Sequence, residues 1–310
     1  MQFLLVRARP ARQGERGMVR RSVAVMVLGA MLASGGLATA TTIERDGGAR
    51  GVGRPEQPPA ETLDELLQRS GLRVQLQSLT AGIRAQFVRA HRKQNSQDRL
   101  TIDRIVSERF AADALYVRIK SELERSAEAG RIEKALAWYD SPLGKRITGQ
   151  ELAALVAIGG VDAEAIADLE QNRPTSRRVD LLTRLDASGG ASETTVDITV
   201  AIVRSLTRAF QPEIPSVATL TPGQLDQQMA KARNRTLEDM RRACLVSMLL
   251  AYRELSDGEL DQYVRFVESE AGNWYMGTMN SALLAAVNAA AESTAAELKS
   301  KVPQLVGDLR

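Results

Sequence analysis

Residues 138–144 read Trp-Tyr-Asp-Ser-Pro-Leu-Gly, and residues 266–272 read Phe-Val-Glu-Ser-Glu-Ala-Gly. The second stretch begins 128 positions after the first and keeps its aromatic residue, its acid, its serine and its glycine in the same places. Each stretch lies between two segments whose apolar residues recur with the period of a helix. A motif repeated at such a distance indicates two copies of one helical unit. We therefore expect an all-α fold made of two related helical bundles packed as an internal repeat.

Each motif predicts a tight corner between two helices. A serine is a favourable N-cap, and Pro142 would occupy the first helical position, where a missing N–H costs nothing. Gly144 would then lie in the first turn, where glycine is unfavourable for helix formation unless another backbone or an aromatic ring approaches closely. The acid before each serine complements the positive end of the following helix.

The scarce aromatic residues gather at the two corners. Such a concentration favours either the core where helices cross or a recognition groove, and the sequence leaves both interpretations open. The candidate corner residues, structural or interacting, are Trp138, Tyr139, Asp140, Ser141, Gly144, Phe266, Glu268, Ser269, Gly272, Trp274 and Tyr275.

Helical periodicity fills most of the chain after residue 61, so repeat 1 is assigned to residues 62–172 and repeat 2 to residues 178–310. Between them, residues 171–177 break the pattern. Apolar positions from Ile102 to Ile119 predict one helix, and the β-branched run at 194–200 is also assigned to a helix. Thr-Pro-Gly-Gln at 221–224 and Ser-Asp-Gly-Glu at 256–259 predict capping boxes. A long Ala-rich helix is expected over residues 270–301.

The first forty residues have the features of a cleavable signal peptide. Six arginines precede or flank a short apolar run from Val23 to Leu32, and Ala-Thr-Ala ends at Ala40, after which cleavage is predicted. The run is shorter than the ~20 residues that a membrane span needs, so no span is expected after cleavage. Met1 and Met18 are both candidate starts, and the paired arginines leave Sec and twin-arginine export open. Residues 41–61 are rich in Gly and Pro and predict a disordered leader.

Removing residues 1–40 changes the charge of the chain. They hold six of its 41 basic residues and one of its 38 acidic residues, which leaves 35 basic and 37 acidic residues. A nucleic-acid-binding protein needs a basic surface to exchange for counterions. The processed chain has no net basic excess, so no nucleic-acid partner is expected.

The sequence offers no catalytic, cofactor or metal site. With one cysteine, Cys244, and one histidine, His91, neither a Cys–His–acid constellation nor a His-based zinc site can form. Cys244 lies in an apolar segment and is interpreted as a buried small residue. Ser141 and Lys145 are one position too far apart for an S-x-x-K motif, so we interpret Ser141 as a cap.

The chain resembles the bacterial envelope family catalogued as the domain of unknown function DUF2059. The resemblance rests on its aromatic-x-acid-Ser-x-x-Gly corner, matched in full at 138–144 and less fully at 266–272, where Glu-Ala replaces Pro-Leu. It implies an exported all-helical protein and implies no activity.

We therefore expect a periplasmic or secreted protein of the cell envelope, most simply a non-enzymatic binding or interaction module. Its partner would be a protein, a peptide or another envelope component. The alternatives are a hydrolase acting on an envelope component and a purely structural protein that associates with itself as a homo-oligomer.

Overall fold

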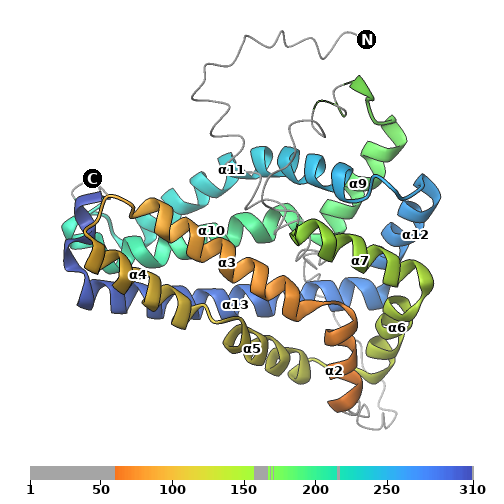
Figure 1. The fold of residues 1–310 in the computed structure, drawn as a ribbon, viewed down its shortest axis with the longest axis horizontal. Helices are drawn as coiled ribbons and strands as arrows, with labels where there is room; N and C mark the ends of the chain where they lie inside the picture. Colours follow the sequence, from red (N-terminus) through yellow and green to blue (C-terminus); the bar gives the residue numbers. More distant parts are fainter. Residues whose placement is uncertain (1–59, 157–166, 168, 170, 215–216, 309–310) are drawn as a thin grey trace, which may run out of the picture.

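The structure, a computed structural model, describes residues 60–156, 167, 169, 171–214 and 217–308 (Figure 1). Within these ranges the chain is built from helices and their connections, with no β-strand, which confirms the all-α prediction. The predicted signal peptide, most of the leader and the choice between Met1 and Met18 lie outside the described residues.

The helices are α2 (Ala60–Arg69), α3 (Leu72–Ala90), α4 (Ser96–Arg109), α5 (Ala112–Arg125), α6 (Ala129–Asp140), α7 (Pro142–Val156), α9 (Ser176–Gly189), α10 (Ala191–Phe210), α11 (Pro222–Ala251), α12 (Asp257–Glu268) and α13 (Glu270–Lys301). Two 3₁₀ helices, η2 (Gln211–Glu213) and η3 (Pro303–Asp308), follow α10 and α13.

Helix α13 is the axis of the fold. It packs against six other helices, namely α4, α5, α6, α9, α10 and α12. Its small side chains allow this close packing, since the distance between helix axes depends on the residues at the contact. Buried residues from all these helices belong to one hydrophobic core.

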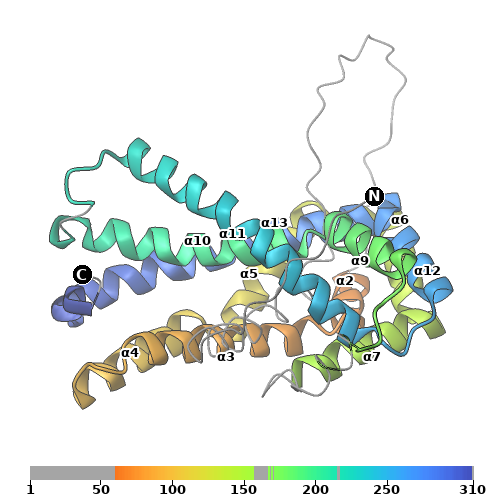
Figure 2. The same ribbon diagram turned by 90° about the horizontal axis from the view of Figure 1, so that it is seen from above.

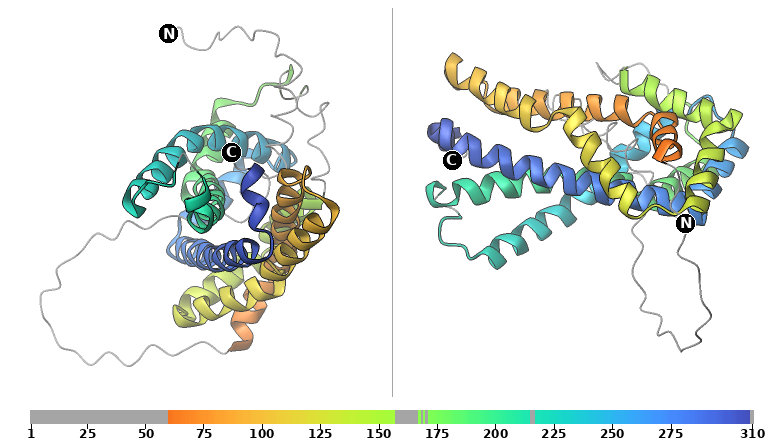
Figure 3. Two further views of the ribbon diagram at one scale, coloured as in Figure 1. Left: turned by 90° about the vertical axis from the view of Figure 1, so that its left-hand side faces the viewer. Right: turned by 90° about the horizontal axis from the view of Figure 1, so that it is seen from below.

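The helices gather at one end of the molecule and diverge toward the other. Figures 1 and 2 show α2, α6, α7, α9 and α12 together at the compact end. From there α3 and α4 extend in one arm, while α10, α11 and α13 extend in another, and Figure 3 shows the same divergence from below. Both predicted corners, α6–α7 and α12–α13, lie at the compact end.

Several local predictions are confirmed. Helix α13 has the expected bounds, and residues 194–200 lie within α10. Both capping boxes are present, at Thr221 with Gln224 and at Ser256 with Glu259.

The single helix predicted across residues 102–119 is wrong. The chain turns between α4 and α5, where Phe110 has φ −100° and Ala111 is extended. The Phe110 side chain is 1% exposed and lies 6.5 Å from the Phe87 ring, between centroids. Burying this ring, while α4 and α5 both pack on α13, favours the turn over a continuous helix.

Of the described helices, none combines the length and the hydropathy that crossing a membrane requires.

Candidate functional site

Ser141 forms the corner between α6 and α7. Its hydroxyl donates to the Trp138 carbonyl oxygen at 2.6 Å and accepts the Gly144 N–H at 2.9 Å. The serine thereby closes α6 and caps α7. A Cβ on Gly144 would lie far inside 3.0 Å of the Trp138 carbonyl oxygen, so this position needs glycine because two backbones meet there.

Ser269 forms the second corner in the same way. Its hydroxyl donates to the Phe266 carbonyl oxygen at 2.6 Å and accepts the Gly272 N–H at 3.1 Å. A Cβ on Gly272 would collide with the Phe266 carbonyl oxygen. The two corners therefore share their capping bonds and the close backbone approach that excludes a side chain.

The acid of each corner pairs with an arginine of a neighbouring helix. Asp140 lies 2.6 Å from Arg69 of α2 and 3.1 Å from Lys145 of α7. Glu268 forms a bidentate ion pair with Arg184 of α9, and the hydrogen-bonded carboxylate raises the pKa of the arginine. Lys145 is thus paired with Asp140, and the Ser141 hydroxyl is bound to the backbone of its own corner.

The corner aromatics bring the two motifs together. The ring centroid of Trp138 lies 4.5 Å from that of Phe266 and 5.8 Å from that of Tyr263, both in stacked geometry. Tyr139 meets Phe266 and Tyr275 edge-on. Tyr139, Tyr275 and Phe266 are buried, while Trp138 and Trp274 are partly buried against the core. These side chains come from α6, α12 and α13 and pack on one another between these helices.

A carboxyl group lies within this aromatic cluster. Glu151 of α7 is 6% exposed, and its Oε1 accepts the hydroxyls of Tyr252 at 2.7 Å and Tyr263 at 2.9 Å. Burial raises the pKa of Glu151 to about 7, against the opposing effect of the two hydrogen bonds. Burial also holds the pKa of Tyr252 well above its ordinary value. The carboxyl therefore binds a proton far more readily than a surface glutamate.

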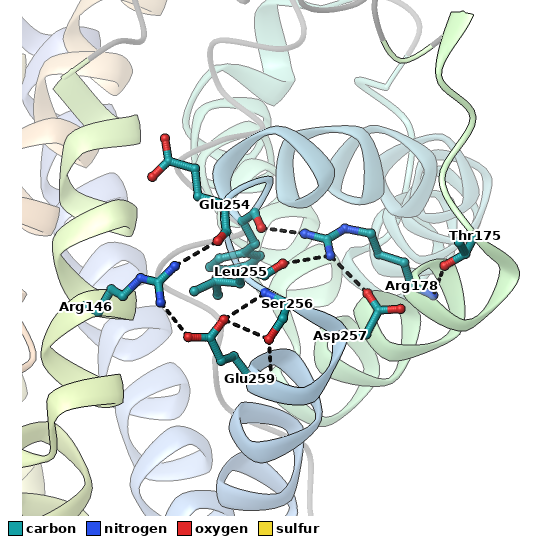
Figure 4. Close-up of polar contacts among 9 residues, drawn as sticks. Arg146, Thr175, Arg178, Glu254, Leu255, Ser256, Asp257 and Glu259 are labelled. Carbon is teal, nitrogen blue, oxygen red and sulfur yellow. Dashed lines mark hydrogen bonds and ion pairs between the residues drawn. The ribbon is translucent and has the colours of Figure 1, made fainter.

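Two arginines hold the turn between α11 and α12, as Figure 4 shows. Arg146 of α7 binds the Glu254 carbonyl oxygen at 2.8 Å and the Glu259 carboxylate. Arg178 of α9 binds the carbonyl oxygens of Tyr252 and Leu255 and the Asp257 carboxylate. Charged donors thus bind carbonyl oxygens at the end of α11 and in the turn, and the Tyr252 oxygen also accepts the Leu255 N–H at 2.9 Å.

Cys244 lies in the core beside a second polar group. Burial raises the pKa of its thiol to about 12, which disfavours the thiolate that nucleophilic chemistry requires. Nearby, Asp186 accepts the Ser192 N–H at 2.9 Å and the Ser192 hydroxyl at 2.7 Å across the turn at Gly190. These bonds cap the start of α10.

Across the described ranges, no cluster of three or more His, Cys, Asp or Glu side chains is placed to hold a metal ion.

A surface hollow of about 350 Å³ lies between α5 and α13. Most of its lining comes from side chains that are small or carry hydroxyl groups. It is lined by Glu122, Ser126, Gly277, Thr278, Ser281, Ala282 and Ala285. Gly277, Ser281 and Ala285 are spaced by four residues, so they share one face of α13.

Sequence reasoning identified both corners but missed Glu151, Tyr252, Tyr263 and the two arginines. A signal for Glu151 was present, because Ile147, Glu151 and Leu155 recur every four residues and all three are buried. An acid within an apolar helical stripe indicates a buried carboxyl. The arginines had no comparable local signal.

Replacing Ser141 by alanine is expected to lower the free energy of unfolding by about 0.5–2 kcal/mol, the usual effect of losing an N-cap. Ser269→Ala should behave alike, because its bonds are the same. Urea unfolding measures both. The control is Ser107→Ala, where an exposed hydroxyl bonds within α4 and a change under about 0.5 kcal/mol is expected. Equal losses in all three variants would contradict the capping role.

No protein-family model, curated protein or solved structure matches the chain.

Proposed function

We propose that the chain is an exported envelope protein that binds a helical segment of a partner protein in the hollow between α5 and α13, without catalysing a reaction. The observation that carries the proposal is the lining of this hollow by small side chains every four residues along α13. Small side chains let a second helix approach closely, and a helix laid in a groove is a common mode of recognition.

The side chains that could act in hydrolysis are all bound to other groups or buried, which supports a binding role over hydrolysis. Ser141 donates and accepts within its corner, and Lys145 pairs with Asp140 instead of activating the serine. Glu151 is enclosed by tyrosines, and Cys244 is buried with a raised pKa. By contrast, the hollow is open at the surface of the molecule.

Export is part of the proposal and rests on the basic, apolar and small-residue pattern of residues 1–40. The resemblance to the DUF2059 family supports the same location. Binding experiments should therefore use the protein expressed with its own residues 1–40 and purified as the cell processes it.

We also infer that the two halves are copies of one helical unit. The corners at Ser141 and Ser269 have matching bonds, as described above. In addition, α2 joins α3 through Gly71 at φ 73°, and α9 joins α10 through Gly190 at φ 68°. Left-handed glycines at corresponding junctions favour a shared origin over two independent solutions.

A photo-crosslinking side chain at Ser281 is expected to capture the partner from the envelope, whereas the same side chain at Ala296 should not. Both positions are exposed on α13, but Ala296 lies outside the hollow. Ser281→Arg should weaken binding of the captured partner at least tenfold, because its bulk fills the hollow, and Ala296→Arg should leave binding unchanged.

The mass of the crosslinked species distinguishes the alternatives. If the crosslinked species has the mass of two copies of this chain, the protein associates with itself, and the structural alternative would replace the proposed binding of a partner protein. Equal capture from positions 281 and 296 would contradict the hollow as the binding site.

A further inference from the structure

The buried carboxyl of Glu151 joins the first half of the chain to the second. Glu151 lies on α7, whereas its two hydroxyl donors belong to the end of α11 and to α12. Beside it on α7, Arg146 binds the same α11–α12 turn, and Ile147 and Leu155 bury the apolar face. Two polar attachments thus hold α7 on this turn, and one of them can gain or lose a proton.

Among the residues that the structure describes, none forms an ion pair with Glu151, so its negative charge has no cationic partner there. Tyr252 of α11 and Tyr263 of α12 donate to it, and Tyr139 of α6 and Tyr275 of α13 lie close enough to interact with it electrostatically. The arginines of the neighbouring helix α3 that form ion pairs are engaged at the surface, with Asp113 and Asp103. On α7 itself, Arg146 is bound to Glu259.

We propose that Glu151 is a proton-operated latch, which holds α7 on the α11–α12 turn while it is protonated and releases α7 when the proton leaves to solvent. The reason is the cost of an unpaired charge among aromatic rings, which is relieved when the carboxyl reaches water. Arg146 stays bound to the α11–α12 turn whether Glu151 is protonated or ionised, so α7 is released first at its Glu151 end.

The direction of the pH effect follows from the raised pKa of the buried carboxyl. Docking favours the protonated form, because the docked pKa of about 7 exceeds the ordinary value near 4.5. Docking is therefore most favourable below pH 4.5, weakens as pH rises from there to about 7, and changes no further at higher pH.

Hydrogen exchange of the α7 backbone amides between pH 5.5 and 8.5, corrected for intrinsic exchange, tests the latch. In the wild type we expect protection of residues 147–156 to fall about tenfold for each pH unit up to about 7, the dependence for one released proton, and to level off above it, where both states are ionised. In Glu151→Gln, which keeps the shape but cannot ionise, protection should stay flat at the low-pH value. In the control Glu254→Gln, an exposed glutamate of the adjacent turn, the wild-type pH profile should persist.

A second variant keeps the test decisive if Glu151→Gln does not fold. Tyr252→Phe removes a hydroxyl that stabilises the carboxylate, which raises the docked pKa, so the pH at which protection levels off should move upward. Three results would each overturn the latch: a wild-type profile without pH dependence, a pH-dependent profile that persists in Glu151→Gln, or a levelling-off pH that Tyr252→Phe lowers or leaves in place.

Discussion

Replacing Gly144 by alanine is expected to destabilise the protein by about 3 kcal/mol or more, the upper end of the effect of overpacking. The new Cβ would meet the Trp138 carbonyl oxygen, and this atom belongs to the backbone and cannot rotate away. Relief requires opening the α6–α7 corner, which also strains the bonds of Ser141. Gly272→Ala should have a comparable effect at the second corner, where the Phe266 carbonyl oxygen is as close.

Gly149→Ala is the matched control, because Gly149 lies in the same helix and a Cβ there would meet no atom within 4 Å. Glycine in a helix interior is less favourable than alanine by about 0.5–1 kcal/mol, so this variant should gain stability. Urea unfolding of the three variants gives the comparison. If Gly144→Ala were as stable as Gly149→Ala, the close approach of the two backbones at the corner would be wrong.

Local rules accounted for much of the fold. Caps, helix-breaking residues and apolar periodicity act over a few positions, and they predicted the bounds of α13 and the starts of α11 and α12. The turn at Phe110 was missed because Phe-Ala-Ala carries no glycine, proline or capping residue. The packing of the Phe110 ring against other helices favours a turn there, and the apolar periodicity of the sequence carries no information about such packing.

The same distinction separates the predicted and missed parts of the candidate site. The corners are short motifs, so their capping serines could be assigned from spacing alone. The partners of Arg178 lie 74 to 79 positions away, and the tyrosine donors of Glu151 lie 101 and 112 positions away. Contacts formed across such separations leave no pattern in one sequence. The twofold repeat, the export signal and the family resemblance stay predictions.

Arg178→Ala is expected to destabilise the protein by about 3 kcal/mol. The arginine side chain is 15% exposed and binds two backbone carbonyls and the Asp257 carboxylate, so alanine would remove all three bonds at once. Leaving a buried acceptor without its charged donor costs about 1–3 kcal/mol, although water entering the half-exposed Asp257 offsets part of the loss. Arg178→Lys should recover only part of it, because one ammonium cannot reproduce the planar guanidinium fork.

Arg177→Ala is the control for this substitution, since Arg177 is the adjacent residue in the first turn of α9 and has the same side chain but is exposed. Its change should stay within about 0.5 kcal/mol. Thermal and urea unfolding measure the difference, and hydrogen exchange should place the loss in residues 252–257, which Arg178 holds. Equal effects of the two alanines would mean that the turn between α11 and α12 keeps its conformation without the guanidinium. In that case the capping box of Ser256 and Glu259, together with Arg146, would be sufficient to fix the turn.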